Sequence, residues 1–227
     1  MTGRRESLWG RRKGKPLSAR RTDLMAEVLP RLAVDIAAPR PDVLADLFVT
    51  RPAVFRLEIG FGGGEHLIHE AEIRPDTGFI GAEPFLNGLA KAVAAIAEKS
   101  LPNIRLFNGD AAMLLDWLPP ASLERVDLLY PDPWPKKRHF KRRFVSPDNL
   151  DRFARALMPG GLFRFASDIE SYVEWTLLHL AGRPDFEWTA ERPDDWRKPF
   201  PGWPGTRYEV KALKAGRKPA YLAFRRR

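Results

Sequence analysis

The 227-residue sequence contains no cysteine, and this absence excludes disulfides, thiolate nucleophiles and thiolate zinc sites. Its four histidines are scattered along the chain, so we expect no metal site. The sequence also lacks an apolar run of about 18 residues, and its first residues carry charges where a signal peptide needs an apolar stretch. We therefore expect a cytoplasmic protein with no membrane span and with metal-free chemistry.

What the chain does have is apolar content and positive charge. Hydrophobic residues make up 44% of the sequence, which is enough to bury a core in a single domain. The formal net charge is +9, and a charge of this sign favours polyanionic partners such as nucleic acid or an anionic membrane surface.

The positive charge is concentrated near the N-terminus. Residues 1–21 hold eight Lys or Arg side chains against one acid, Glu6, and few apolar residues. We expect residues 1–21 to form a mobile basic arm and residues 22–227 to form a single domain.

Strand-like and helix-like segments alternate through the middle of the chain. Apolar spacing first predicts a helix over 22–36, interrupted by Pro30. The predicted strands that follow are 54–61, 78–84, 103–110, 125–132 and 161–168. One predicted helix begins at Glu65, and the others cover 85–99, 111–118, 146–158 and 169–181. Alternation of this kind predicts an α/β fold with a mostly parallel sheet and helices on both faces.

The C-terminal segment contains two further strand-like pieces, 207–214 and 219–226, separated by four residues. We interpret them as an antiparallel hairpin that closes the sheet.

Ligands of open parallel sheets bind at the carboxyl ends of the strands. The first predicted strand carries Glu58 and continues into a turn with Gly60, Gly62 and Gly64. Such glycines allow the backbone to approach a ligand closely, with a tight strand-to-helix turn as the less favoured alternative. Glu65 stands where a dinucleotide-binding loop has its third glycine, and its charge argues against a pyrophosphate ligand.

Two more strands end in acids. Glu83 follows Glu58 by 25 positions, at a place where a carboxylate accepts hydrogen bonds from ribose hydroxyls. Asp110 ends the next strand, and it either binds a ligand or forms the N-cap of the helix that follows, or both.

The fourth strand ends in the most unusual stretch of the chain, "YPDPWPKKRHFKRR", residues 130–143. It places one carboxylate, Asp132, in front of six Lys or Arg side chains. A basic loop at a strand end suits phosphate binding, with a solvated surface loop as the alternative. Trp134 and Phe140 either stack on bases or cover the core.

These residues resemble the S-adenosylmethionine-dependent class I methyltransferases, which have a Rossmann-like fold. The stretch "PDPWPKKRHFKRR", followed by "FASD" (165–168) and "TRYE" (206–209), is similar in particular to the bacterial tRNA (guanine-N7-)-methyltransferase family, from about residue 22 onward. The resemblance implies an enzyme that transfers a methyl group from S-adenosylmethionine to N7 of a guanine in the variable loop of tRNA. It leaves the role of the N-terminal arm open.

The resemblance also implies roles for individual residues. Asp132 would be catalytic. The cofactor-binding residues would be Glu58, Gly60, Gly62, Gly64, Glu83, Asp110 and Asp132. Those contacting the substrate would be Lys136, Asp168, Thr206, Arg207, Tyr208 and Glu209. Those contacting RNA would be Arg138, His139, Phe140, Lys141, Arg142 and Arg143.

Some alternatives stay open. Asp168 also suits the N-cap of the next helix, and "TRYE" also suits the entry of a hairpin. A methyltransferase acting on an exocyclic amine is suggested by the partial likeness of "PDPW" to an Asp-Pro-Pro-Tyr motif, and a non-catalytic RNA-binding protein is a third reading. The sequence does not distinguish a monomer from a homodimer.

Overall fold

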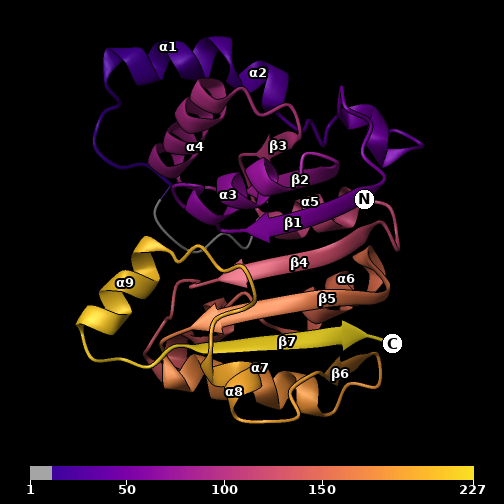
Figure 1. Cartoon of the computed structure of the whole chain (residues 1–227), viewed down its shortest axis with the longest axis vertical. Coiled ribbons are helices and arrows are strands. Elements are labelled where there is room, and N and C mark those ends of the chain that lie inside the picture. Colours follow the sequence, from indigo (N-terminus) through magenta and orange to yellow (C-terminus); the bar gives the residue numbers. More distant parts are fainter. Residues whose placement is uncertain (1–11) are drawn as a thin grey trace.

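A seven-stranded sheet forms the centre of the structure, a computed structural model that describes residues 12–227 (Figure 1). Its strand order is β3-β2-β1-β4-β5-β7-β6. The strands are β1 (Val54–Ile59), β2 (Thr77–Ala82), β3 (Ile104–Phe107), β4 (Leu123–Leu129), β5 (Leu157–Ser167), β6 (Phe186–Trp188) and β7 (Ala220–Arg226). The first five strands are parallel, and β7 runs antiparallel between β5 and β6.

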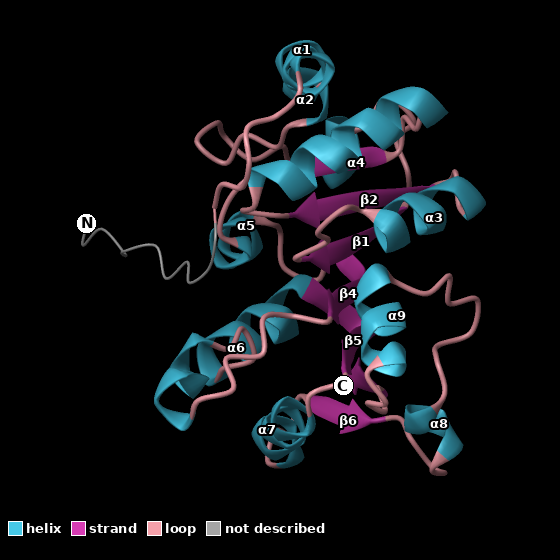
Figure 2. Ribbon diagram, turned by 90° about the vertical axis from the view of Figure 1, so that its left-hand side faces the viewer, coloured by secondary structure: helices cyan, strands magenta, loops and turns pink. Residues whose placement is uncertain are grey.

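Helices cover both faces of this sheet (Figure 2). With α3, α4 and α9 on one face and α5, α6 and α7 on the other, the sheet is buried from both sides. The helices are α1 (Ala19–Glu27), α2 (Leu29–Leu32), α3 (Glu65–Ile73), α4 (Leu86–Lys99), α5 (Ala111–Trp117), α6 (Pro147–Ala156), α7 (Glu170–Ala181), α8 (Asp194–Arg197) and α9 (Arg207–Lys214), with 3-10 turns η1 (Leu44–Leu47) and η2 (Lys137–Arg142).

The predicted α/β class, with a mostly parallel sheet and an antiparallel C-terminal hairpin, is confirmed. Local sequence explains the helix starts: α6 begins with Pro147 in its first turn, and the Ser146 hydroxyl accepts a hydrogen bond from the Asn149 N–H at 3.4 Å. Leu114, Phe153 and Tyr172 of α5, α6 and α7 lie in one buried apolar cluster. Leu67 and Leu89 of α3 and α4 belong to a second.

The strands of the hairpin differ from those predicted. Residues 207–214 form helix α9 rather than a strand, and β7 pairs instead with the short strand β6. The reason is a capping box: the Thr206 hydroxyl accepts from the Glu209 N–H at 3.1 Å while the Glu209 carboxylate accepts from the Thr206 N–H at 3.3 Å. Glu209 and Ala212 are the buried members of α9, at helical rather than strand spacing.

Part of the predicted basic arm lies along the start of α4. The Leu86 N–H donates to the Arg12 carbonyl at 3.0 Å, and the Asn87 side chain bonds the Gly14 N–H and the Lys15 carbonyl, both at 2.7 Å. The other arm residues, 1–11, lie outside the described residues, so the arm's mobility stays a prediction. No helix within residues 12–227 is long and apolar enough to cross a membrane.

Candidate active site

A cavity of about 730 Å³ lies at the carboxyl ends of the parallel strands. This is the position where a doubly wound sheet places its ligands, because neighbouring crossovers diverge there. The predicted site residues that line the cavity are Gly60, Gly62, Glu83, Asp110, Asp132, Lys141, Arg142, Arg143, Arg207 and Tyr208.

The turn after β1 is held open by backbone conformation. Gly60, Gly62 and Gly64 all have positive φ, at 71°, 57° and 81°, which side chains with a Cβ rarely adopt. Gly60 and Gly62 line the cavity. Gly64 instead lets α3 pack against α4, because a Cβ at this position would lie 3.0 Å from the Ala92 Cβ.

Glu83 joins the second strand to this turn. One of its carboxylate oxygens accepts from the Gly62 N–H at 2.6 Å and the other from the Phe85 N–H at 2.9 Å. Burial raises the pKa of Glu83, and Asp132 adds to this, while the two backbone hydrogen bonds and Arg207 oppose it. The net direction is upward, so a cation bound in the cavity would stabilise the ionised form of this carboxylate.

Asp110 has both of the roles that the sequence left open. Its carboxylate accepts from the Ala112 N–H at 3.0 Å, which makes it the N-cap of α5. The same residue also lines the cavity. Its position beside a ligand and its capping role are therefore compatible.

Glu58 lies beneath the turn rather than on the cavity wall. It is buried, and its Oε2 lies 2.7 Å from Nδ1 of His66, the second residue of α3. His66 Nε2 in turn lies 3.3 Å from the Arg164 guanidinium. Any contribution of Glu58 to ligand binding is therefore coupled to His66.

Next to this contact, charged side chains form a buried ionic layer between the sheet and α3. Arg164 and Arg125 donate to the two carboxylate oxygens of Asp127 at 2.6 and 2.8 Å, and Arg125 also pairs with Glu70. Burial would raise the pKa of Asp127, but the two guanidinium groups and His66 hold it well below its usual range.

Sequence reasoning missed the ionic layer, although a signal was present. Arg56 and Glu58 in β1, and Arg125 and Asp127 in β4, are charged residues at alternate positions of strands predicted to be covered on both faces. Charged residues at such positions need partners, because an unpaired buried charge is costly.

Asp132 lies in the turn that follows β4. Tyr130 and Trp134, two residues to either side, have positive φ of 50° and 43°, so the turn is strained at both ends. The Asp132 carboxylate accepts no hydrogen bond and forms no ion pair with residues 12–227, and it opens into the cavity. Partial burial raises its pKa.

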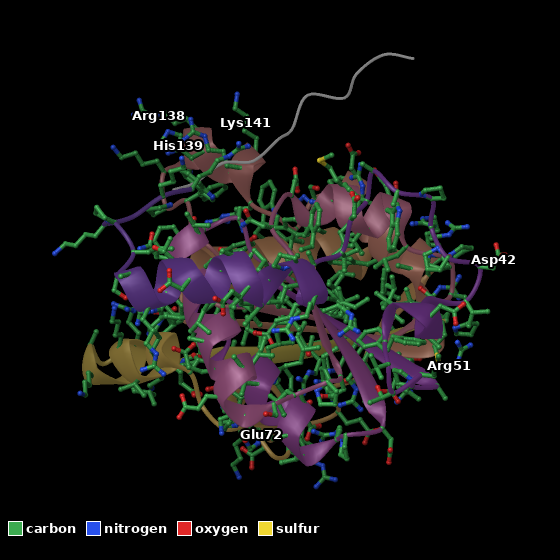
Figure 3. The ribbon with its side chains drawn as sticks, turned by 90° about the horizontal axis from the view of Figure 1, so that it is seen from above. Asp42, Arg51, Glu72, Arg138, His139 and Lys141 are labelled. Atoms are coloured by element: carbon green, nitrogen blue, oxygen red, sulfur yellow. The ribbon has the colours of Figure 1, made fainter. Side chains whose placement is uncertain are left out.

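Beyond this turn, the basic loop borders the cavity with Lys141, Arg142 and Arg143 and exposes other cations to solvent. The exposed cations of residues 136–142 are Lys136, Lys137, Arg138 and Lys141. Figure 3 shows Arg138, His139 and Lys141 projecting together from one end of the molecule. The half-buried Trp134 ring packs against His139 and the Arg142 guanidinium.

Arg143 differs from its neighbours, because only 2% of its surface is exposed. Its guanidinium donates to the Pro133 carbonyl at 3.1 Å and to the Ser171 carbonyl and hydroxyl at 2.6 and 2.9 Å. It also lies over the rings of Phe140, at 3.6 Å, and Tyr172. This geometry argues against the predicted RNA contact of Arg143 and indicates that it holds the basic loop on α7. Phe140 is half-buried, and its ring packs edge-on against Trp175 of α7.

Asp168, Thr206 and Glu209 do not line the cavity, and neither does Lys136. Asp168 pairs with Arg217 at 2.5 Å and does not cap α7, whose N-cap is Ile169. Glu209 is buried and accepts from the Trp203 indole N–H at 2.7 Å and from the Tyr221 hydroxyl. Asp168 and Glu209 are therefore both bound by protein partners.

The strand order, the glycine turn and the acids at the strand ends define a class I methyltransferase fold. Solved structures agree: the 16S rRNA methyltransferase KamB has a TM-score of 0.57 at 16% identity, covering 82% of this chain and 94% of its own. A putative methyltransferase from Streptococcus mutans in complex with SAH has a TM-score of 0.51 at 10% identity, covering 82% and 94%.

Sequence comparison is more specific. Residues 52–222 match the family described as "Putative methyltransferase". The tRNA (guanine-N(7)-)-methyltransferase of Rhizobium meliloti (strain 1021) is 59% identical over 221 residues, which are 97% of this chain and 95% of that protein. The chain belongs to the tRNA (guanine-N7-)-methyltransferase family, as the motifs had indicated.

Proposed function

We propose that this enzyme transfers a methyl group from S-adenosylmethionine to N7 of a guanine in tRNA. The observation that carries the proposal is Asp132: a carboxylate with no partner in residues 12–227, facing the cavity at the end of β4 and followed directly by a basic loop. By resemblance the guanine is in the variable loop, and the proposal includes a cytoplasmic location, where tRNA substrates are found.

The residues of the cavity fit this cofactor. S-Adenosylmethionine carries a sulfonium and an ammonium, and the carboxylates that line the cavity include Glu83, Asp110 and Asp132. No phosphate has to be held, which suits a turn in which Glu65 replaces a glycine. The S. mutans neighbour was solved with SAH, a second observation in favour of this cofactor.

When bound, the cofactor supplies an electrophilic methyl group. Guanine N7 has an in-plane lone pair and no proton, so the chain needs to orient the base and does not need a general base. The Asp132 carboxylate suits the donor edge of guanine, formed by N1–H and the 2-amino group. There it would also stabilise positive charge that develops on the purine during transfer.

The exposed cations Lys136, Lys137, Arg138 and Lys141 suit the phosphates of tRNA, because each such contact releases counterions from the RNA. Residues 22–227 would act as one catalytic domain, with the basic arm as an addition to it. The proposal includes neither metal nor membrane.

The test is to incubate the full-length protein with methyl-labelled cofactor and a tRNA transcript, digest the RNA and identify the labelled nucleoside. We expect 7-methylguanosine. A methylated exocyclic amine, or the absence of any labelled nucleoside from a protein that binds the cofactor, would contradict the proposal.

A second arm uses a tRNA with 7-deazaguanine at the modified position, identified from the first arm. This RNA should bind as well as the parent tRNA but accept no methyl group, because a C–H group replaces the nucleophilic lone pair. Methyl incorporation at that nucleotide would exclude N7 chemistry.

A further inference from the structure

Arg207, the first residue of α9, lies against the glycine turn. A Cβ on Gly62 would be 3.3 Å from the Arg207 Nη2, so the guanidinium reaches the space that the glycine leaves free. The residue lines the cavity, and its positive charge lowers the pKa of Glu83 against the stronger effect of burial. A residue that is distant in sequence from the turn thus completes one wall of the cavity.

The hydrogen bonding of this guanidinium is incomplete. Its Nη2 donates to the Tyr208 hydroxyl at 2.9 Å, and the group lies 4.8 Å from the centre of the Tyr208 ring. Its Nε is buried and finds no acceptor within residues 12–227. A buried donor without an acceptor is destabilising, so this geometry suits a ligand that brings an acceptor.

The charges of the cavity identify that acceptor. Glu83, Asp110 and Asp132 suit the cationic groups of S-adenosylmethionine, but the methionine moiety also carries a carboxylate. A guanidinium is the side chain that best matches a carboxylate, through paired N–H donors.

Two other arginines of the cavity are bound by protein partners, and a third, Arg142, lies over the Trp134 ring with a buried Nε that, like that of Arg207, has no acceptor within residues 12–227. Arg152 is paired with Asp116 at 2.9 Å, and Arg143 is bound to Pro133 and Ser171. Arg207 is the guanidinium placed on the glycine turn itself.

We infer that Arg207 binds the carboxylate of the cofactor's methionine moiety, whereas the family resemblance suggested a contact with the substrate. Tyr208 orients the guanidinium. The inference rests on the proposed function, because it requires S-adenosylmethionine as the ligand.

The test measures calorimetric affinity of the full-length protein for two ligands, S-adenosylmethionine and its decarboxylated analogue, which lacks only the carboxylate. Arg207→Gln should weaken binding of S-adenosylmethionine tenfold or more and binding of the analogue less than twofold. Arg207→Lys should lie between Arg207→Gln and the parent. Lys211→Gln removes an exposed charge from the same helix and should leave both affinities unchanged.

Equal losses for the two ligands in Arg207→Gln would overturn the inference, since Arg207 would then support the turn rather than the carboxylate. So would an unchanged affinity for S-adenosylmethionine. A parent protein that binds neither ligand would instead contradict the proposed function. Melting curves of Arg207→Gln and Lys211→Gln, measured alongside, show whether the fold is retained.

Two further measurements keep the assignment testable if Arg207→Gln unfolds. Tyr208→Phe removes the hydroxyl that accepts from Arg207. It should weaken binding of S-adenosylmethionine more than binding of the analogue. Binding of tRNA to Arg207→Lys should stay within twofold of the parent. A selective loss of tRNA affinity, with a flatter salt dependence and unchanged cofactor binding, would assign Arg207 to a phosphate and overturn the inference.

Discussion

The Gly62 N–H donates a hydrogen bond of 2.6 Å to the Glu83 carboxylate, so the acid at the end of β2 holds the turn at the end of β1. The same carboxylate also accepts from the Phe85 N–H. Glu83 therefore has two effects on a bound cofactor: it offers acceptor positions to a ligand, and it fixes the turn on which the ligand would lie.

Replacing Glu83 by Gln should weaken cofactor binding tenfold or more, because a charged hydrogen bond is worth about 1.5 to 3 kcal/mol and the amide NH₂ cannot accept from a backbone N–H. Calorimetry with S-adenosylmethionine measures the loss. Glu65→Gln, which neutralises an exposed acid at the end of the same turn, is the control and should bind like the parent. Equal dissociation constants for Glu83→Gln and the parent would remove Glu83 from the site.

Cofactor affinity should decrease as the pH falls. The pKa values of Glu83 and Asp132 are both raised, so these carboxylates take up protons at a higher pH than ordinary ones, and a cationic ligand binds their ionised forms. Calorimetry from about pH 7.5 to about pH 5, above the ordinary carboxyl range, should show weaker binding and proton release at the acidic end. An affinity that is independent of pH across this range would contradict the assignment of the two acids.

Replacing Arg143 should affect stability, whereas replacing Arg138 should affect tRNA binding. Arg143→Ala removes a buried guanidinium with three hydrogen bonds, and we expect the melting temperature to fall by several degrees, at about 2 to 4 °C per kcal/mol for a chain of this size. Arg138→Ala removes an exposed cation and should leave the melting temperature unchanged. It should instead reduce the slope of log tRNA affinity against log salt by about one.

If Arg143→Ala lowers the salt slope as Arg138→Ala does, while its melting temperature stays at the parental value, Arg143 contacts RNA after all. Melting curves and tRNA titrations at several salt concentrations distinguish the two cases.

The difference between Arg138 and Arg143 shows which features of the site could be predicted from the sequence and which could not. The motif of residues 130–143 identified a basic loop at a strand end, but charge alone does not say which cation points inward. Arg143 is buried because Phe140, Tyr172 and Trp175 surround it, and Tyr172 and Trp175 are on α7, distant in sequence. Contacts of this kind depend on tertiary packing and leave no local pattern.

The secondary structure up to residue 181 was more predictable than that of the C-terminal segment. Strands and helices up to residue 181 have strong periodicity and caps, and the structure follows them within a few residues at most boundaries. The segment 207–214 alternates apolar and polar residues like a strand, yet the Thr206 and Glu209 capping box makes it a helix. The pairing of Thr206 with Glu209, three residues apart, was the local signal that the alternation obscured.

His66 should make stability depend on pH. Burial lowers its pKa, but the Glu58 carboxylate and, further away, Asp127 raise it, and the net direction is upward. A histidine whose pKa is higher in the folded state stabilises the protein fully below its unfolded value of about 6.5, and this contribution is lost as the pH rises through the folded value.

The free energy of unfolding should therefore fall as the pH rises above about 6.5, by at most about 1.4 kcal/mol per pH unit for one proton. In His66→Gln this decline should be absent. Urea titrations of both proteins at several pH values provide the measurement, with His69→Gln as the control for loss of another histidine from the same helix. Parallel pH profiles for the parent and His66→Gln would exclude the coupling.

The last prediction concerns Asp132. Replacement by Asn keeps the size of the side chain but removes its charge and turns one acceptor into a donor, which would oppose the donor edge of guanine. Because the carboxylate accepts no hydrogen bond from residues 12–227, Asp132→Asn should melt at the parental temperature, in contrast to Arg143→Ala.

The loss in Asp132→Asn should instead appear in the rate of methyl transfer. A charge that acts mainly in the transition state is worth about 3 to 4 kcal/mol, or roughly 10² to 10³ in rate, and substrate binding should survive better than turnover. Single-turnover methylation at saturating cofactor and tRNA measures this directly. A near-parental rate, or a lowered melting temperature that accounts for the whole loss, would mean that Asp132 serves the strained turn between Tyr130 and Trp134 rather than the reaction.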